Sequence, residues 1–155
     1  MKSASIQEIK KELLQLTQPQ LVEYCLRLAK YKKENKELLN YLLFEATAAQ
    51  DYIEVVKNEI DSLFTTINYK QVFFAKKTLR KILRFCTKCI KQTGTKEAEI
   101  EILAHFCICL KKSPLPIASY PVLFNMQQAQ LKKITNSIQS LHPDLQYDYL
   151  KLIDF

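Results

Sequence analysis

Apolar residues recur along this chain at spacings of three and four positions, which is the period of an α-helix. No stretch alternates with the two-residue period of a β-strand. The pattern predicts helices over residues 6–16, 18–32, 35–46, 48–66, 69–92, 96–111, 120–140 and 143–153. A polar run at residues 32–36 predicts a break between the second and third helices.

Residues that cap helices stand at the start of most of these segments. In a capping box, a Ser, Thr or Asn lies three residues before a Glu or Gln, and each side chain accepts a hydrogen bond from the other residue's backbone N–H. The pairs that fit are Ser5/Glu8, Thr17/Gln20, Thr47/Gln50 and Asn68/Gln71. Further helix starts are predicted at Thr95, at Ser119 before Pro121, and at His142 before Pro143.

Short loops join most of the predicted helices, so consecutive helices are expected to lie antiparallel. The proline-containing link at residues 111–120 predicts an extended connection before the seventh helix. With 155 residues, the chain has the size of one domain. We therefore expect a single all-α domain over residues 1–155, built as an antiparallel helical bundle or a short helical-repeat-like stack of seven to eight helices.

Composition excludes several classes of protein. A single glycine, Gly94, cannot build the glycine-rich loops that bind phosphates or dinucleotides. The N-terminus has no apolar signal core, and the longest uncharged run, residues 113–131, is too polar for a membrane span. Five cysteines without a secretion signal indicate reduced thiols. We expect a cytoplasmic protein without a membrane span.

The net charge of +7 is concentrated in one segment. Residues 62–96 contain nine Lys or Arg and no Asp or Glu. On a helical wheel of residues 69–92, one stripe is apolar and is expected to be buried: Val72, Ala75, Leu79, Ile82, Leu83, Cys86 and Ile90. The opposite side, which we call the basic face, consists of Lys70, Lys77, Arg80, Lys81, Arg84, Lys88 and Lys91.

A basic face of this kind is suited to an acidic protein or another polyanion, nucleic acid included. Two other interpretations are a solvated outer face and a face paired with acidic residues of helix 48–66, namely Asp51, Glu54, Glu59 and Asp61. Phe73, Phe74 and Phe85 lie beside the apolar stripe. We expect them to flank the core rather than to stack on bases.

Cysteines offer the one pattern that suggests a metal: Cys86-x-x-Cys89, together with Cys107, Cys109 and His105. Both cysteine pairs fall inside predicted helices, where Cys107 and Cys109 point about 200° apart. Cys86 also lies near the C-terminal end of its helix, which does not lower a thiol pKa. We therefore expect packed cysteines, with no metal and no cofactor. Metal or redox regulation through Cys86 and Cys89 is kept as an alternative.

Groups suited to catalysis are few. The two histidines are the only side chains that ordinarily titrate near neutral pH. His105 lies in an apolar run, and His142 stands before a proline at a helix start, so we expect structural roles for both. No nucleophile elbow or HExxH motif is present. We expect no enzyme and no catalytic residues. The favoured function is a helical interaction or scaffold module that presents the basic face to an acidic partner, and the alternative is a nucleic-acid-binding protein.

Several positions in the first half of the chain form a recognisable pattern: Ile9-Lys10-Lys11, Leu14, Leu16-Thr17, Leu21, Leu26, Leu28, Lys30-Tyr31-Lys32-Lys33, Leu38, Tyr41 and Phe44. With this pattern, the chain over about residues 6–110 resembles an uncharacterised, all-helical bacterial domain family of unknown function. The resemblance also includes the lysine-rich helix that ends before Gly94. It implies an all-helical fold and supplies no site residues.

Overall fold

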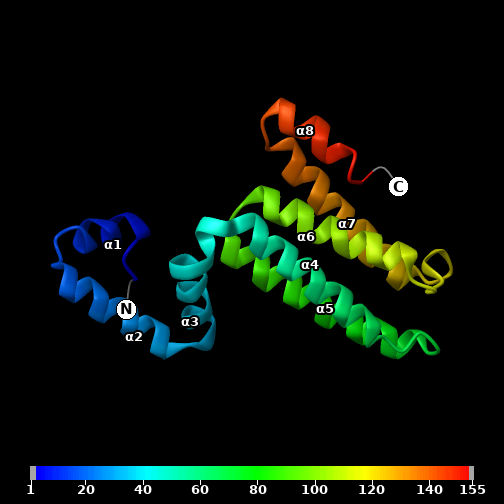
Figure 1. The fold of residues 1–155 in the computed structure, drawn as a ribbon, viewed down its shortest axis with the longest axis horizontal. Helices are drawn as coiled ribbons and strands as arrows, with labels where there is room; N and C mark the ends of the chain where they lie inside the picture. The colour runs from blue at the N-terminus through cyan, green and yellow to red at the C-terminus, as the bar shows by residue number, and fades with distance from the viewer. Residues whose placement is uncertain (1–2, 154–155) are drawn as a thin grey trace. The chain divides into compact units, whose positions relative to one another are not determined.

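A computed structural model describes residues 3–153 as helices joined by turns, with no strand among them (Figure 1). The predicted all-α fold class is confirmed. Contacts group the chain into two compact units, residues 1–44 and 45–155. The single domain over residues 1–155 stays a prediction, and each unit has its own internal packing.

The first unit contains three helices, α1 (Ile6–Leu13), α2 (Gln18–Tyr31) and α3 (Lys33–Asn40). Both predicted capping boxes are formed here, before α1 and before α2. The Ser5 backbone N–H donates to Glu8 Oε2 at 2.7 Å, and the Thr17 N–H donates to Gln20 Oε1 at 2.9 Å. The predicted break between α2 and α3 is at Lys32, whose backbone is extended. A π-helical turn (Tyr41–Glu45) and a 3-10 turn (Ala46–Ala48) follow α3.

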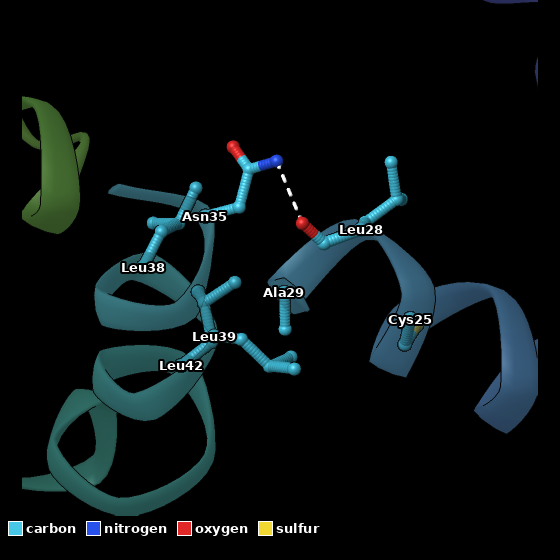
Figure 2. Close-up of a pocket in the computed structure, with 7 residues that line it drawn as sticks. All are labelled: Cys25, Leu28, Ala29, Asn35, Leu38, Leu39 and Leu42. Atoms are coloured by element: carbon cyan, nitrogen blue, oxygen red, sulfur yellow. Dashed lines mark hydrogen bonds between the residues drawn. The ribbon is translucent and has the colours of Figure 1, made fainter. Parts of the chain in front are cut away.

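Helices α2 and α3 pack against each other around a shallow apolar groove of about 230 Å³ (Figure 2). The Asn35 side-chain amide donates to the Leu28 carbonyl at 2.9 Å and ties the two helices together at one end. None of the residues of α1, α2 or α3 is buried. The groove is lined by Cys25, Leu28, Ala29, Asn35, Leu38, Leu39 and Leu42.

The second unit is built around α6. Its helices are α4 (Ala49–Thr65), α5 (Val72–Thr93), α6 (Lys96–Lys112), α7 (Pro121–Gln139) and α8 (Pro143–Leu150), with a 3-10 turn (Ile117–Ser119) before α7. α6 contacts α4, α5 and α7. It is apolar on most sides, which is why several helices cover it. Because α4, α5 and α6 follow one another as antiparallel neighbours, α4 and α6 run parallel (Figure 1).

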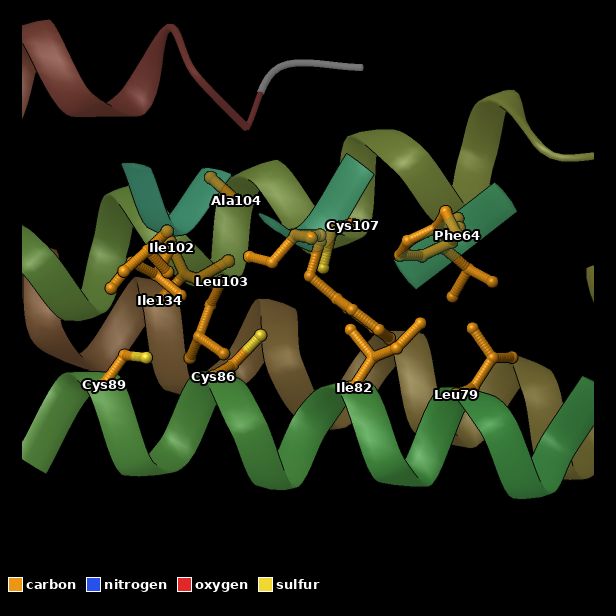
Figure 3. Packing of buried hydrophobic residues seen from close by; sticks show 14 of the residues in the cluster. Phe64, Leu79, Ile82, Cys86, Cys89, Ile102, Leu103, Ala104, Cys107 and Ile134 are labelled. Atoms are coloured by element: carbon orange, nitrogen blue, oxygen red, sulfur yellow. The ribbon is translucent and has the colours of Figure 1, made fainter. Parts of the chain in front are cut away.

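The apolar stripe of α5 lies on the predicted side (Figure 3). Leu79, Ile82 and Cys86 are fully buried, as predicted. Val72, Leu83 and Ile90 are half-buried and pack against the edge of the core. α5 ends at Gly94, which takes the left-handed conformation (φ 67°) and donates its N–H to the Ile90 carbonyl at 2.9 Å. This tight turn returns the chain directly into α6.

A polar cluster centred on Glu101 joins three helices of the second unit. Lys57 of α4 contacts Glu101 Oε2 at 2.9 Å, and the Gln50 side-chain amide donates to the same oxygen at 3.2 Å. The Tyr149 hydroxyl of α8 donates to Glu101 Oε1 at 3.3 Å. Burial, together with the charge and hydrogen bond of Glu101, raises the pKa of Tyr149 to about 12. Because Lys57 and Tyr149 share one carboxylate, α8 is linked to α4 through α6.

Three predicted helix-capping residues are wrong. α4 begins after Ala48, and the side chain of Gln50 binds Glu101 instead of forming a box with Thr47. The Asn68 Oδ1 atom accepts from the Lys70 N–H at 3.1 Å in a turn, so the Asn68/Gln71 box is absent and α5 begins at Val72. Tyr120, rather than Ser119, caps α7. The starts at Thr95 and His142 are confirmed, and both side chains accept a backbone N–H.

Among the described residues, every helix is too short or too polar to cross a lipid bilayer. This agrees with the expectation of a chain without a membrane span.

Replacing Leu79 with alanine is expected to lower the free energy of unfolding by about 2–5 kcal/mol, because it removes buried methyl groups and leaves a cavity. Leu83→Ala is the matched control, since Leu83 lies on the same helix but is half-buried, and it should cost clearly less. Chemical denaturation of both variants measures the difference. Equal losses would show that the two residues are equally buried in solution.

Alkaline pH is expected to remove the stabilisation that Tyr149 provides. Since folding raises the pKa of Tyr149 from 10 to about 12, its contribution is full below about pH 10 and is lost as the pH rises toward 12. The difference in unfolding free energy between the wild type and Tyr149→Phe should therefore shrink above pH 10. Urea unfolding of both proteins across this range measures it, and a constant difference would contradict the contact with Glu101.

Candidate functional site

The basic face predicted from the sequence is an exposed surface of α5. Six of its residues lie on the helix, whereas Lys70 lies in the turn before it. All seven side chains are exposed: Lys70, Lys77, Arg80, Lys81, Arg84, Lys88 and Lys91. From Lys77 to Lys91 the face extends about 21 Å along the helix axis, at 1.5 Å per residue. The structure therefore brings the predicted site residues together as one elongated positive surface.

Packing of the opposite side explains why this face points outward. The apolar stripe of α5 contacts α4 and α6, and Leu79, Ile82 and Cys86 point into the core between them (Figure 3). Side chains half a turn away, at about 200° from the stripe, then point away from α4 and α6. The position of the basic face is fixed by the burial of the stripe.

Two acidic residues of α4, Glu54 and Asp61, pair with side chains outside the basic face. Glu54 binds Lys57 at 2.8 Å, and Asp61 Oδ1 lies 2.7 Å from His105 Nε2. Among residues 3–153, six members of the face form no ion pair with a carboxylate: Lys70, Lys77, Arg80, Lys81, Arg84 and Lys91. The expected alternative of intramolecular pairing with α4 is therefore absent for these six residues.

Two aromatic rings extend the basic face toward the start of α5. Phe73 and Phe74 are 57% and 47% exposed, and their ring centroids lie 5.5 Å apart in an edge-to-face arrangement. Lys77 Nζ lies 4.8 Å from the centroid of the Phe73 ring, which is a cation–π contact. Phe85 packs against the core as expected, but that expectation is wrong for Phe73 and Phe74.

The helical wheel of α5 already places Phe73 on the side that carries the basic residues. At about 100° per residue, Phe73 lies about 125° from the centre of the apolar stripe. It precedes Lys77 by four positions, which places the two side chains on the same face. The ring is therefore a member of the surface that carries the lysines.

Cysteines fill the core instead of meeting around one ion. Cys86, Cys89 and Cys107 are buried, and the first two point from α5 toward α6 (Figure 3). Burial raises the pKa of Cys86 and of Cys107 to about 12. The thiols of Cys86 and Cys107 therefore stay protonated at neutral pH, which disfavours redox chemistry through Cys86, because the thiolate is the reactive form. No disulfide joins cysteines in the part of the chain that is described.

Cys109 and His105 lie apart from the other cysteines, on the side of α6 that faces α4. The Cys109 thiol donates to Asp61 Oδ1 at 3.2 Å, and His105 Nε2 contacts the same oxygen. Burial tends to raise the pKa of Asp61, but hydrogen bonds from His105 and Cys109 outweigh it, so this pKa lies below its usual value. His142 has the structural role that was expected, because Nδ1 accepts the Asp144 N–H at the start of α8.

Comparisons of this chain with models of protein families, with curated proteins and with solved structures found no match. The resemblance to a bacterial helical family stays a prediction. The geometry of the basic face is therefore the basis on which a function is proposed.

Thiol reactivity is expected to separate the surface cysteine from the packed ones. Cys25 is exposed, whereas Cys86, Cys89 and Cys107 are buried. With a disulfide reagent at about pH 8, one thiol of the five should react fast in the folded protein, and the rest should follow after denaturation. Cys25→Ser is the control and should abolish the fast phase. Fast modification of Cys86 or Cys89 would instead support the redox alternative.

Proposed function

We propose that this protein is a non-enzymatic helical interaction or scaffold module whose basic face binds an acidic protein. The observation that carries the proposal is the exposed row of seven cations on and beside α5. Six of them lack an ion-paired carboxylate among residues 3–153, as described above. A partner with a row of carboxylates would supply the missing negative charges.

Repulsion among the basic residues of α5, Lys76 included, supports a bound anion. Between Lys76 and Lys91, seven pairs of basic residues stand three or four positions apart. At about 0.2–0.5 kcal/mol for each pair, this repulsion costs an isolated helix about 1.5–3.5 kcal/mol. Salt reduces this cost, and an acidic partner that places carboxylates between the cations removes it. Binding therefore gains both the new attractions and the relief of the existing repulsion.

The composition of the face favours a protein over a nucleic acid. Five of its seven residues are lysines, which act as point charges and lack the planar fork with which arginine reads bases. One observation supports the alternative, a nucleic-acid-binding protein. The exposed rings of Phe73 and Phe74 lie beside Lys77, and exposed aromatic rings next to cations stack on the bases of single strands. A cytoplasmic location belongs to the proposal with either partner.

Reversing the charge of Lys77, Arg80, Lys81 and Arg84 to glutamate is expected to release the partner. This variant changes the net charge from +7 to −1. Pull-downs at about 0.15 M salt should recover acidic proteins with the wild type and lose them with the variant. The matched control reverses Lys10, Lys30, Lys132 and Lys133, which are also exposed. It changes the net charge equally and should keep the partners.

Nucleic-acid binding by the wild type, the α5 charge-reversal variant and the control variant decides between the two proposed partners. With random-sequence DNA or RNA, the wild type should bind only weakly, and physiological salt should abolish the binding because released counterions drive it. Sub-micromolar binding that survives this salt, disappears with the α5 reversals and persists in the control would contradict the protein partner. It would favour the nucleic-acid alternative, and Phe73→Ala would then be expected to weaken single-strand binding.

A further inference from the structure

Three side chains of different chemistry converge where α4 lies beside α6. His105 and Cys109 are one helical turn apart on α6, so they share a face. Asp61 reaches them from α4, with Oδ1 at 2.7 Å from His105 Nε2 and at 3.2 Å from Cys109 Sγ. One donor atom from each residue lies within 4.8 Å of the other two.

We propose that Asp61, His105 and Cys109 form a binding site for a divalent transition-metal ion, with zinc as the best fit. Zinc accepts this mixture of thiolate, imidazole and carboxylate, and it prefers four ligands in a tetrahedron. Three residues of the chain leave one coordination position for water or a ligand from outside. The site is separate from the basic face, and it does not depend on the proposed function.

Distances between the donor atoms suit such an ion. In a tetrahedral zinc site with bonds of 2.0–2.3 Å, neighbouring donor atoms stand about 3.4–3.6 Å apart. The two shortest separations here are 2.7 and 3.2 Å, so an ion requires Asp61 to move outward by less than about 1 Å. His105 Nε2 and Cys109 Sγ lie within 4.8 Å of each other, so these two side chains must close by at most about 1.4 Å. The Asp61 side chain is 54% exposed, which leaves it room for this movement. His105 and Cys109 are half-buried and are held by α6.

Without an ion, the same residues form a hydrogen-bonded cluster around Asp61 Oδ1. Burial and the adjacent carboxylate raise the pKa of Cys109 to about 12, so the thiol keeps its proton. Binding of a zinc ion forms a sulfur–zinc bond and breaks the sulfur–hydrogen bond, and the proton leaves to solvent. The positive charge of Lys112 acts on Asp61 and opposes the ion. Removing this charge should therefore strengthen binding.

Cobalt(II) titration of the full, reduced and tag-free chain tests the site directly. A thiolate-to-cobalt charge-transfer band should saturate at one ion per chain, and zinc should then displace the cobalt. Cys109→Ser should abolish the band. His105→Gln and Asp61→Asn should each lower the affinity for cobalt by about 100-fold or more. Loss of a residue that only contacts a metal ligand lowers metal affinity by about 10–100-fold, and loss of a ligand itself should cost at least as much. Circular dichroism of each variant verifies that its helices are intact.

Matched controls locate the ion. Cys25→Ser removes an exposed thiol, and His142→Gln removes an exposed imidazole, and both should bind cobalt and zinc like the wild type. Lys112→Gln should bind more tightly. Absence of a thiolate–cobalt band in the folded wild type would overturn the proposal. A band that survives Cys109→Ser but is lost with Cys25→Ser would overturn it as well.

Discussion

Burial of α6 is the constraint on which the second unit depends. Half-buried or buried side chains occupy nearly every position from Glu97 to Leu110, so this helix must be covered on several sides at once. α4, α5 and α7 provide that cover. The left-handed turn at Gly94 places α5 directly against α6. The parallel pairing of α4 with α6 then follows, because the chain reverses direction twice between them, once before α5 and once after it.

Burial of the apolar stripe of α5 contributes more to stability than the repulsion among its cations costs. Burial of a large apolar side chain such as Leu79 or Ile82 contributes about 1.5–3 kcal/mol. Each pair of like charges on the other side costs about 0.2–0.5 kcal/mol. The apolar stripe therefore fixes how α5 is rotated, and the cations are held outward although they repel one another. A surface of this kind is stable before any partner binds it.

Periodicity and capping residues predicted most of the helices because both are local properties of the sequence. The capping boxes at Ser5 and Thr17 and the rotation of α5 follow from neighbours within one turn. The cluster of Asp61 with His105 could not be predicted in this way. These residues are 44 positions apart, and they meet only because α4 runs beside α6. Gln50 illustrates the same limit, since a distant glutamate displaced its expected local contact.

Helices α1 and α2 begin with capping boxes, but none of the residues of α1, α2 or α3 is buried, and this has a consequence for how the chain opens. Helices of 8, 14 and 8 residues are close to or below the length at which an isolated helix is stable in water. Their hydrogen bonds are protected by end caps and by the α2–α3 contact rather than by a core. Amide protons of α1, α2 and α3 are therefore expected to exchange with solvent through small local openings, whereas those of α6 are expected to exchange only when the second unit unfolds as a whole.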